Sequence, residues 1–187
     1  IIVDNLDEIP VIAAAATARG RRQAVMVRVT PGVKPSTHSY ISTGQLDSKF
    51  GFSIQGGPAA EAVAAVRRAR SLSLEGLHCH IGSQLFDLGG YQAAAAIVAD
   101  FASTLNGARL GAMNMGGGLG IAYEGGPAPD PADYVRRIVT AARSSGLKLA
   151  IEPDSVMPSS SSWPSIFSVY ESTSFESTGS YFWPCEA

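Results

Sequence analysis

Cysteine, excess charge and long apolar runs are all scarce in this sequence of 187 residues. Its two cysteines, Cys79 and Cys185, are too few for a disulfide framework, and Cys79 is expected to be a reduced, buried thiol of a cytoplasmic protein. The formal net charge of -2 offers no electrostatic case for binding nucleic acid or an anionic membrane. The longest apolar runs are far shorter than the roughly 20 residues that a membrane helix requires.

Short apolar stretches alternate instead with helical patterns. Strands are predicted at 1–4, 24–30, 74–81, 111–115 and 147–153, with helices at 6–20, 58–71, 89–106 and 131–146. A long polar loop extends to about residue 50. This α/β alternation predicts a parallel sheet that is covered by helices.

Two α/β architectures have this pattern: an open doubly wound sheet, and part of a TIM-like (β/α)8 barrel. Asp4, Arg28, His80, Gly116–Gly118 and Glu152 all fall at or just past the carboxyl ends of the predicted strands. Chemical groups on so many successive strands favour a barrel rim over a single switch point. Because a barrel needs eight strands, about three are missing. We therefore expect a fragment.

The last segment, 154–187, differs from the rest because it is serine-rich and has no clear period. The expected organisation is a barrel part at 1–153 followed by a tail that is not native to that fold. A shifted reading frame after Pro153 would explain such a tail.

Glycine-rich and histidine-rich stretches carry the candidate chemistry. The run "GGGLG" is either a flexible turn or a cradle whose amides bind phosphate, and Ser83 is placed to donate a hydroxyl to the same group. His78 and His80 suggest a metal only weakly, because no third ligand is suitably spaced, and no metal is expected. Glu152 needs a cationic partner, either Arg28 or a protonated ring nitrogen.

Four motifs together resemble the diaminopimelate decarboxylase family of fold-type III pyridoxal-phosphate enzymes. They are "VMVRVTPGVKPSTHSYISTGQLDSKFGFSI", "LEGLHCHIGSQLFD", "MNMGGGLGIAYEGG" and "LAIEP". The resemblance covers residues 1 to about 153. It implies that pyridoxal 5'-phosphate is the cofactor. The implied roles are His80 stacked on the ring, Ser83 and Gly116, Gly117 and Gly118 at the phosphate, Glu152 at the pyridine nitrogen, and Arg28 beneath the cofactor.

The sequence departs from this family at three places. The Schiff-base lysine is absent, since Lys34, Lys49 and Lys148 do not fit its position and it should lie upstream of Ile1. The glycine and the substrate-binding arginine that follow "EP" in the family are replaced by Asp154 and Ser155. The terminal Cys185-Glu186 pair is a chance match to a family motif that belongs in a later domain.

The resemblance implies a lyase that converts meso-diaminopimelate to L-lysine and CO2 in lysine biosynthesis, with an amino-acid substrate and a homodimeric full-length protein. The fragment alone is expected to be inactive. Two alternatives stay open. One is a noncatalytic regulatory or binding homologue that lacks the lysine, and the other is a different fold-type III decarboxylase of the ornithine or arginine type.

Overall fold

A computed structural model of the chain describes residues 1–33, 50–105, 107, 109–122, 126–152 and 181–183. The strands are β1 (Ile2–Val3), β2 (Gln23–Thr30), β3 (Phe52–Ser53), β4 (Leu72–His78), β5 (Ala112–Asn114), β6 (Lys148–Ile151) and β7 (Tyr181–Trp183). The helices are α1 (Glu8–Ala18), α2 (Pro58–Arg68), α3 (Leu88–Thr104) and α4 (Pro131–Ala142), and a 3-10 turn follows α4 at Arg143–Ser145.

The main strands of the sheet lie side by side in the same order as in the chain. The strand order is β1-β2-β4-β5-β6, with every neighbouring pair among them parallel and in chain order. A doubly wound sheet would reverse this order at a switch point, whereas a barrel adds each strand beside the previous one. The order therefore confirms the predicted partial α/β barrel.

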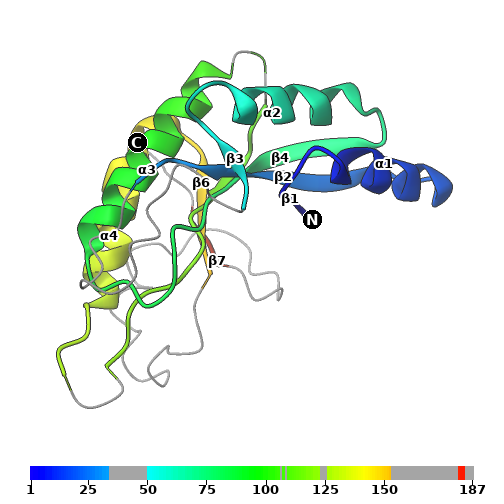
Figure 1. Ribbon diagram of the computed structural model, residues 1–187. Coiled ribbons are helices and arrows are strands. Elements are labelled where there is room, and N and C mark those ends of the chain that lie inside the picture. Colours follow the sequence, from blue (N-terminus) through cyan, green and yellow to red (C-terminus); the bar gives the residue numbers. More distant parts are fainter. Residues whose placement is uncertain (34–49, 106, 108, 123–125, 153–180, 184–187) are drawn as a thin grey trace.

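The two faces of the sheet differ in what they contact. In β2 the alternate residues Val25, Val27 and Val29 are buried in the same apolar core as Val63 and Val66 of α2. Helices α2, α3 and α4 lie along one side of the curved sheet (Figure 1). Because successive residues of a strand face opposite ways, Arg28 of β2 lies on the other face, toward the interior of the incomplete barrel.

The predicted elements are present, but several of their ends were wrong. The strand expected at 74–81 ends at His78, so His80 lies in the loop beyond it. The helix expected to begin at residue 6 begins at Glu8. In the turn before it, the Glu8 N–H donates to Asn5 Oδ1 (3.1 Å) and Asn5 Nδ2 donates to Glu8 Oε1 (3.1 Å).

Two strands lie outside the predicted set. β3 pairs in parallel with the end of β2, with Phe52 opposite Val29. β7 pairs antiparallel with β6 and is the described part of the serine-rich segment. Residues 153–180, which separate Glu152 from β7, lie outside the described part of the chain, so the expected division at residue 153 stays a prediction.

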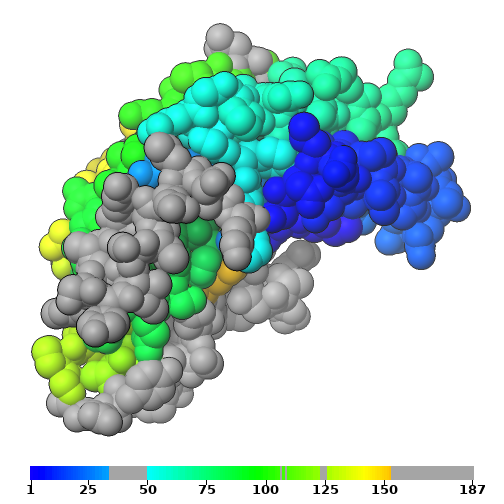
Figure 2. Space-filling view, viewed as in Figure 1, coloured from blue at the N-terminus to red at the C-terminus, as the bar shows by residue number. Residues whose placement is uncertain are grey.

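The N-terminal strand β1 is an edge strand. Ile1 and Ile2 are 61% and 39% exposed, and the N-terminal residues, blue in Figure 2, form one side of the molecule. Among the described helices, none has both the length and the apolar character needed to cross a membrane.

Candidate functional site

A row of polar side chains crosses the sheet near the carboxyl ends of its strands. Arg28 of β2 pairs in register with His78 of β4, and His78 pairs with Asn114 of β5. Residues paired across a parallel sheet face the same way. Glu152 follows β6 directly, and its N–H donates to the Gly116 carbonyl (2.8 Å). The register thus brings four polar residues from four strands to one rim.

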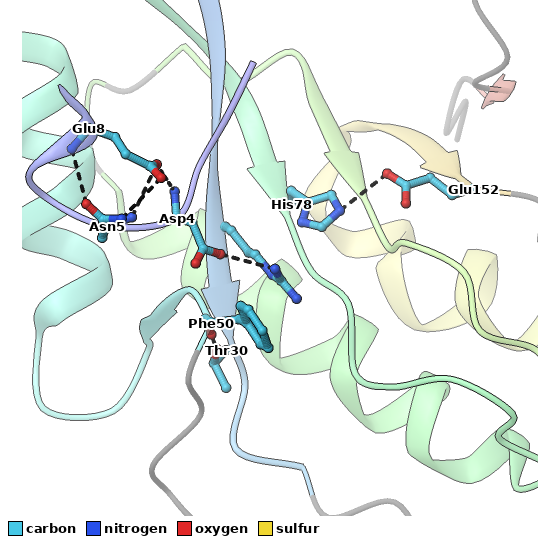
Figure 3. A network of polar contacts seen from close by, with 8 residues as sticks. Asp4, Asn5, Glu8, Thr30, Phe50, His78 and Glu152 are labelled. Carbon is cyan, nitrogen blue, oxygen red and sulfur yellow. Dashed lines mark hydrogen bonds and ion pairs between the residues drawn. The ribbon is translucent and has the colours of Figure 1, made fainter. Parts of the chain in front are cut away.

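The carboxylate of Glu152 is held through one of its oxygens. His78 Nε2 lies 3.3 Å from Glu152 Oε1, and Asn114 Nδ2 donates to the same oxygen at 3.0 Å. Figure 3 shows the His78 ring pointing toward this carboxylate. Within the described residues, Glu152 Oε2 has no hydrogen-bond partner, and the side chain is 42% exposed. The second oxygen is therefore available to a ligand.

The surroundings of His78 favour its neutral form. Burial lowers the pKa of His78 below its ordinary value of 6.5, and the positive charge of Arg28 and the ring of His80 lower it further, whereas the Glu152 carboxylate raises it. A neutral imidazole carries one N–H, and the adjacent carboxylate oxygen requires that N–H to be on Nε2. Glu152 thus receives two neutral donors from His78 and Asn114.

Arg28 is paired elsewhere. Its Nη1 lies 3.1 Å from Asp4 Oδ1, and its guanidinium carbon lies 5.0 Å from the centroid of the Phe50 ring (Figure 3). The alternative in which Arg28 forms a salt bridge with Glu152 was therefore wrong. Within the described residues, Glu152 has no cationic partner.

The loop after β4 and the glycine run after β5 are joined by backbone hydrogen bonds. Leu85 N–H donates to the Gly118 carbonyl (2.9 Å), and Gly120 N–H donates to the Leu85 carbonyl (2.8 Å). The side chain of Gln84 accepts from Ile121 N–H (2.8 Å). The two glycine-containing motifs of the sequence therefore form one continuous surface.

Three side chains form hydrogen bonds with the backbone of the glycine run after β5. Gly116 N–H donates to Asn114 Oδ1 (2.9 Å), and Gly117 N–H lies 3.4 Å from His80 Nδ1. Tyr91 of α3 donates its hydroxyl to the Gly117 carbonyl (3.2 Å). The N–H groups of Gly116 and Gly117 therefore both have acceptors within the protein.

The structure brings most of the predicted site residues to one edge. His80 contacts the glycine run, Glu152 contacts its backbone, and Ser83 is exposed in the adjoining loop. Arg28 belongs to the same polar row, but strands β4 and β5 lie between its strand, β2, and β6, which Glu152 follows. Lys34, Lys49, Asp154, Ser155, Cys185 and Glu186 all lie outside the described residues.

Asn114 and Tyr91 were missed by sequence reasoning. Asn114 had a usable signal, because it is a polar residue inside an apolar strand, and a buried amide needs partners. His78 was considered only as a metal ligand. Across the described ranges, no group of three or more His, Cys, Asp or Glu side chains is arranged to hold a metal ion.

Comparison with known proteins gives a consistent result. Residues 1–157 match the pyridoxal-binding domain of the pyridoxal-dependent decarboxylases. The chain is 35% identical over 178 residues to a diaminopimelate decarboxylase of Corynebacterium efficiens, and the match covers 91% of this chain and 39% of that protein. It is 36% identical over 163 residues to the enzyme of Bacillus subtilis, covering 81% and 36%.

Solved structures give the same picture. Diaminopimelate decarboxylase from Helicobacter pylori, crystallised with L-lysine, superposes with a TM-score of 0.73 at 32% identity. The superposition covers 81% of this chain and 39% of that one. The chain thus spans about two fifths of the length of the C. efficiens protein.

Proposed function

This chain belongs to the pyridoxal-dependent decarboxylases, since residues 1–157 match their pyridoxal-binding domain, and from this premise we propose that it is the cofactor-binding part of a diaminopimelate decarboxylase. The full protein would convert meso-diaminopimelate to L-lysine and CO2. The cofactor of the family is pyridoxal 5'-phosphate. The names of the relatives from C. efficiens and B. subtilis support this choice of substrate.

One observation carries the proposal: a carboxylate that lacks a counter-charge. Within the described residues, Glu152 accepts an imidazole nitrogen and an amide nitrogen on Oε1 and has no Lys or Arg side chain within ion-pair distance. A carboxylate oxygen with no partner within the described residues can accept a charge-assisted hydrogen bond from a cation. A protonated pyridine nitrogen has the required charge and a single N–H to donate.

The residues present fit the cofactor. Glu152 would face the ring nitrogen, His80 would cover a ring face, and Ser83 with Gly117 and Gly118 would line the phosphate site. When bound, the cofactor supplies a protonated ring that accepts the electron pair left by departing CO2. The part of this chain would be to keep the proton on that nitrogen through Glu152.

The activity needs more than the described residues contain. Lys148, which begins β6, lies at the opposite end of its strand from Glu152. We propose that the Schiff-base lysine and the substrate-binding groups lie elsewhere in a cytoplasmic, homodimeric full protein. The 187-residue chain alone is then expected to release no CO2 from diaminopimelate.

The test uses the full protein that contains this chain. With pyridoxal phosphate it should release CO2 from meso-diaminopimelate in preference to L-ornithine or L-arginine. Preference for ornithine or arginine would assign it to the polyamine-forming branch instead. Cofactor binding without decarboxylation of any of the three would support the noncatalytic alternative and overturn the proposed activity.

A further inference from the structure

We propose that His78 is a positioning residue for the cofactor: it donates its Nε2–H to Glu152 Oε1 beside Asn114, and so leaves Glu152 Oε2 to accept the ring N–H. This inference rests on the proposed function, because the ligand of Oε2 is the pyridine ring of the cofactor.

The geometry supports this role. His78 and Asn114 are in register on neighbouring strands and both reach Oε1, at 3.3 Å and 3.0 Å. A carboxylate oxygen that accepts two donors has little capacity for a third, whereas the other oxygen keeps both lone pairs. His78 and Asn114 thereby fix both the orientation of the carboxylate and which of its oxygens meets the ligand.

The surroundings of the buried His78 ring also indicate which of its two nitrogens carries the proton. The side chain of His78 is 6% exposed, and its Nδ1 has no hydrogen-bond partner among the described residues. An unprotonated Nδ1 is an acceptor, and an unpaired acceptor is tolerated better than an unpaired buried N–H. The unpaired Nδ1 therefore agrees with a proton on Nε2.

The electrostatic surroundings keep the imidazole uncharged. Arg28 on β2 and His80 beyond β4 both disfavour a second proton on His78, and only Glu152 favours it. A neutral donor stabilises the carboxylate without neutralising it. A protonated His78 would instead supply the counter-charge that the cofactor ring is proposed to supply.

The experiment measures ring protonation in the full protein, with 4'-deoxypyridoxine 5'-phosphate as the probe. This analogue has no aldehyde, so it forms no bond with any lysine, and its absorption spectrum reports whether the ring nitrogen carries a proton. The apparent pKa of the bound ring is obtained by titration, while circular dichroism and thermal unfolding report folding.

In the wild type the bound ring should have a higher pKa than the free analogue, and Glu152→Gln should abolish the increase. His78→Phe removes the donor that orients the carboxylate, so Oε2 should no longer be held toward the ring, and the bound-ring pKa should fall toward the value measured for Glu152→Gln. His78→Gln, whose amide nitrogen replaces Nε2, should retain most of the increase. His78→Asn, whose amide is too short, should not.

Cys79→Ala is the matched control, because Cys79 is also buried and adjacent in sequence but has no contact with Glu152. It should leave the bound-ring pKa unchanged. A folded His78→Phe or His78→Asn variant with the wild-type ring pKa would overturn the inference alone. If the wild type does not raise the ring pKa above that of the free analogue, or if Glu152→Gln leaves the bound-ring pKa unchanged, both the proposed function and this inference are wrong.

Discussion

Gly118 and Gly82 are in direct backbone contact: a Cβ atom on Gly118 would overlap with the carbonyl oxygen of Gly82. Gly118 also has a φ of +92°, which side chains rarely adopt. This contact joins the loop after β4 to the glycine run after β5, and so closes the surface on which the phosphate is proposed to lie.

Gly118→Ala should therefore separate the two loops. We expect a loss of about 3 kcal/mol or more in the free energy of unfolding, because backbone strain and steric overlap act together. Affinity for the phosphate-bearing analogue should fall as well. Urea unfolding and a binding titration measure the two effects. Gly126→Ala is the control, since its added Cβ would meet nothing within 4 Å. If Gly118→Ala and Gly126→Ala had equal free energies of unfolding, the close contact between Gly118 and Gly82 would be contradicted.

Substitution of Asn114 should destabilise the protein, because its side chain both donates to Glu152 and accepts from Gly116 N–H. Asn114→Leu leaves the buried Gly116 N–H without its acceptor and removes a donor from Glu152, so unfolding should become easier by about 2 kcal/mol. Asn114→Asp keeps the acceptor for Gly116 but places a second carboxylate beside Glu152. Its loss of stability relative to wild type should be larger at pH 7 than near pH 4, where carboxyl groups take up protons. Urea unfolding at both pH values measures this difference, and equal losses would argue against the carboxylate contact.

Cys79 should be unreactive in the folded protein. Burial raises the pKa of the Cys79 thiol to about 12, so almost no thiolate forms at neutral pH. In a Cys185→Ser background, a disulfide reagent at pH 8 should modify Cys79 at least on the order of 100-fold more slowly in native protein than in urea. Rapid modification without unfolding would show that β4 is not buried as described.

His78 should make stability depend on pH. Its pKa in the folded state lies below the ordinary 6.5, so the unfolded chain binds the proton more tightly. The associated stability is complete above about pH 6.5 and declines as the pH falls through the lowered folded pKa. In urea unfolding between pH 7.5 and 5, His78→Phe should lose less stability than wild type does. Parallel profiles would contradict a neutral, buried His78.

The order of the elements was readable from local pattern. Apolar strands such as the one predicted at 24–30, and helices such as the one predicted at 58–71 and observed at Pro58–Arg68, follow from periodicity and turn chemistry, which depend on near neighbours alone. The two-residue strand β3 was missed because so short a strand exists only through its pairing with β2. The helix predicted from residue 6 begins at Glu8, because a periodic pattern fixes a helix end only to within a residue or two.

The types of residue at the site were equally readable, but not the pairs that they form. Glycines, a histidine and a carboxylate after successive strands indicated one rim, because parallel strands end at the same edge. That His78 rather than Arg28 meets Glu152, and that Asn114 joins Glu152 to Gly116, depends on the register of β2, β4, β5 and β6. Register is set by how the strands pack across the whole sheet, and a shift of one residue would turn each side chain to the other face. The partners of a buried polar group are therefore a property of the assembled sheet and cannot be read from any one strand.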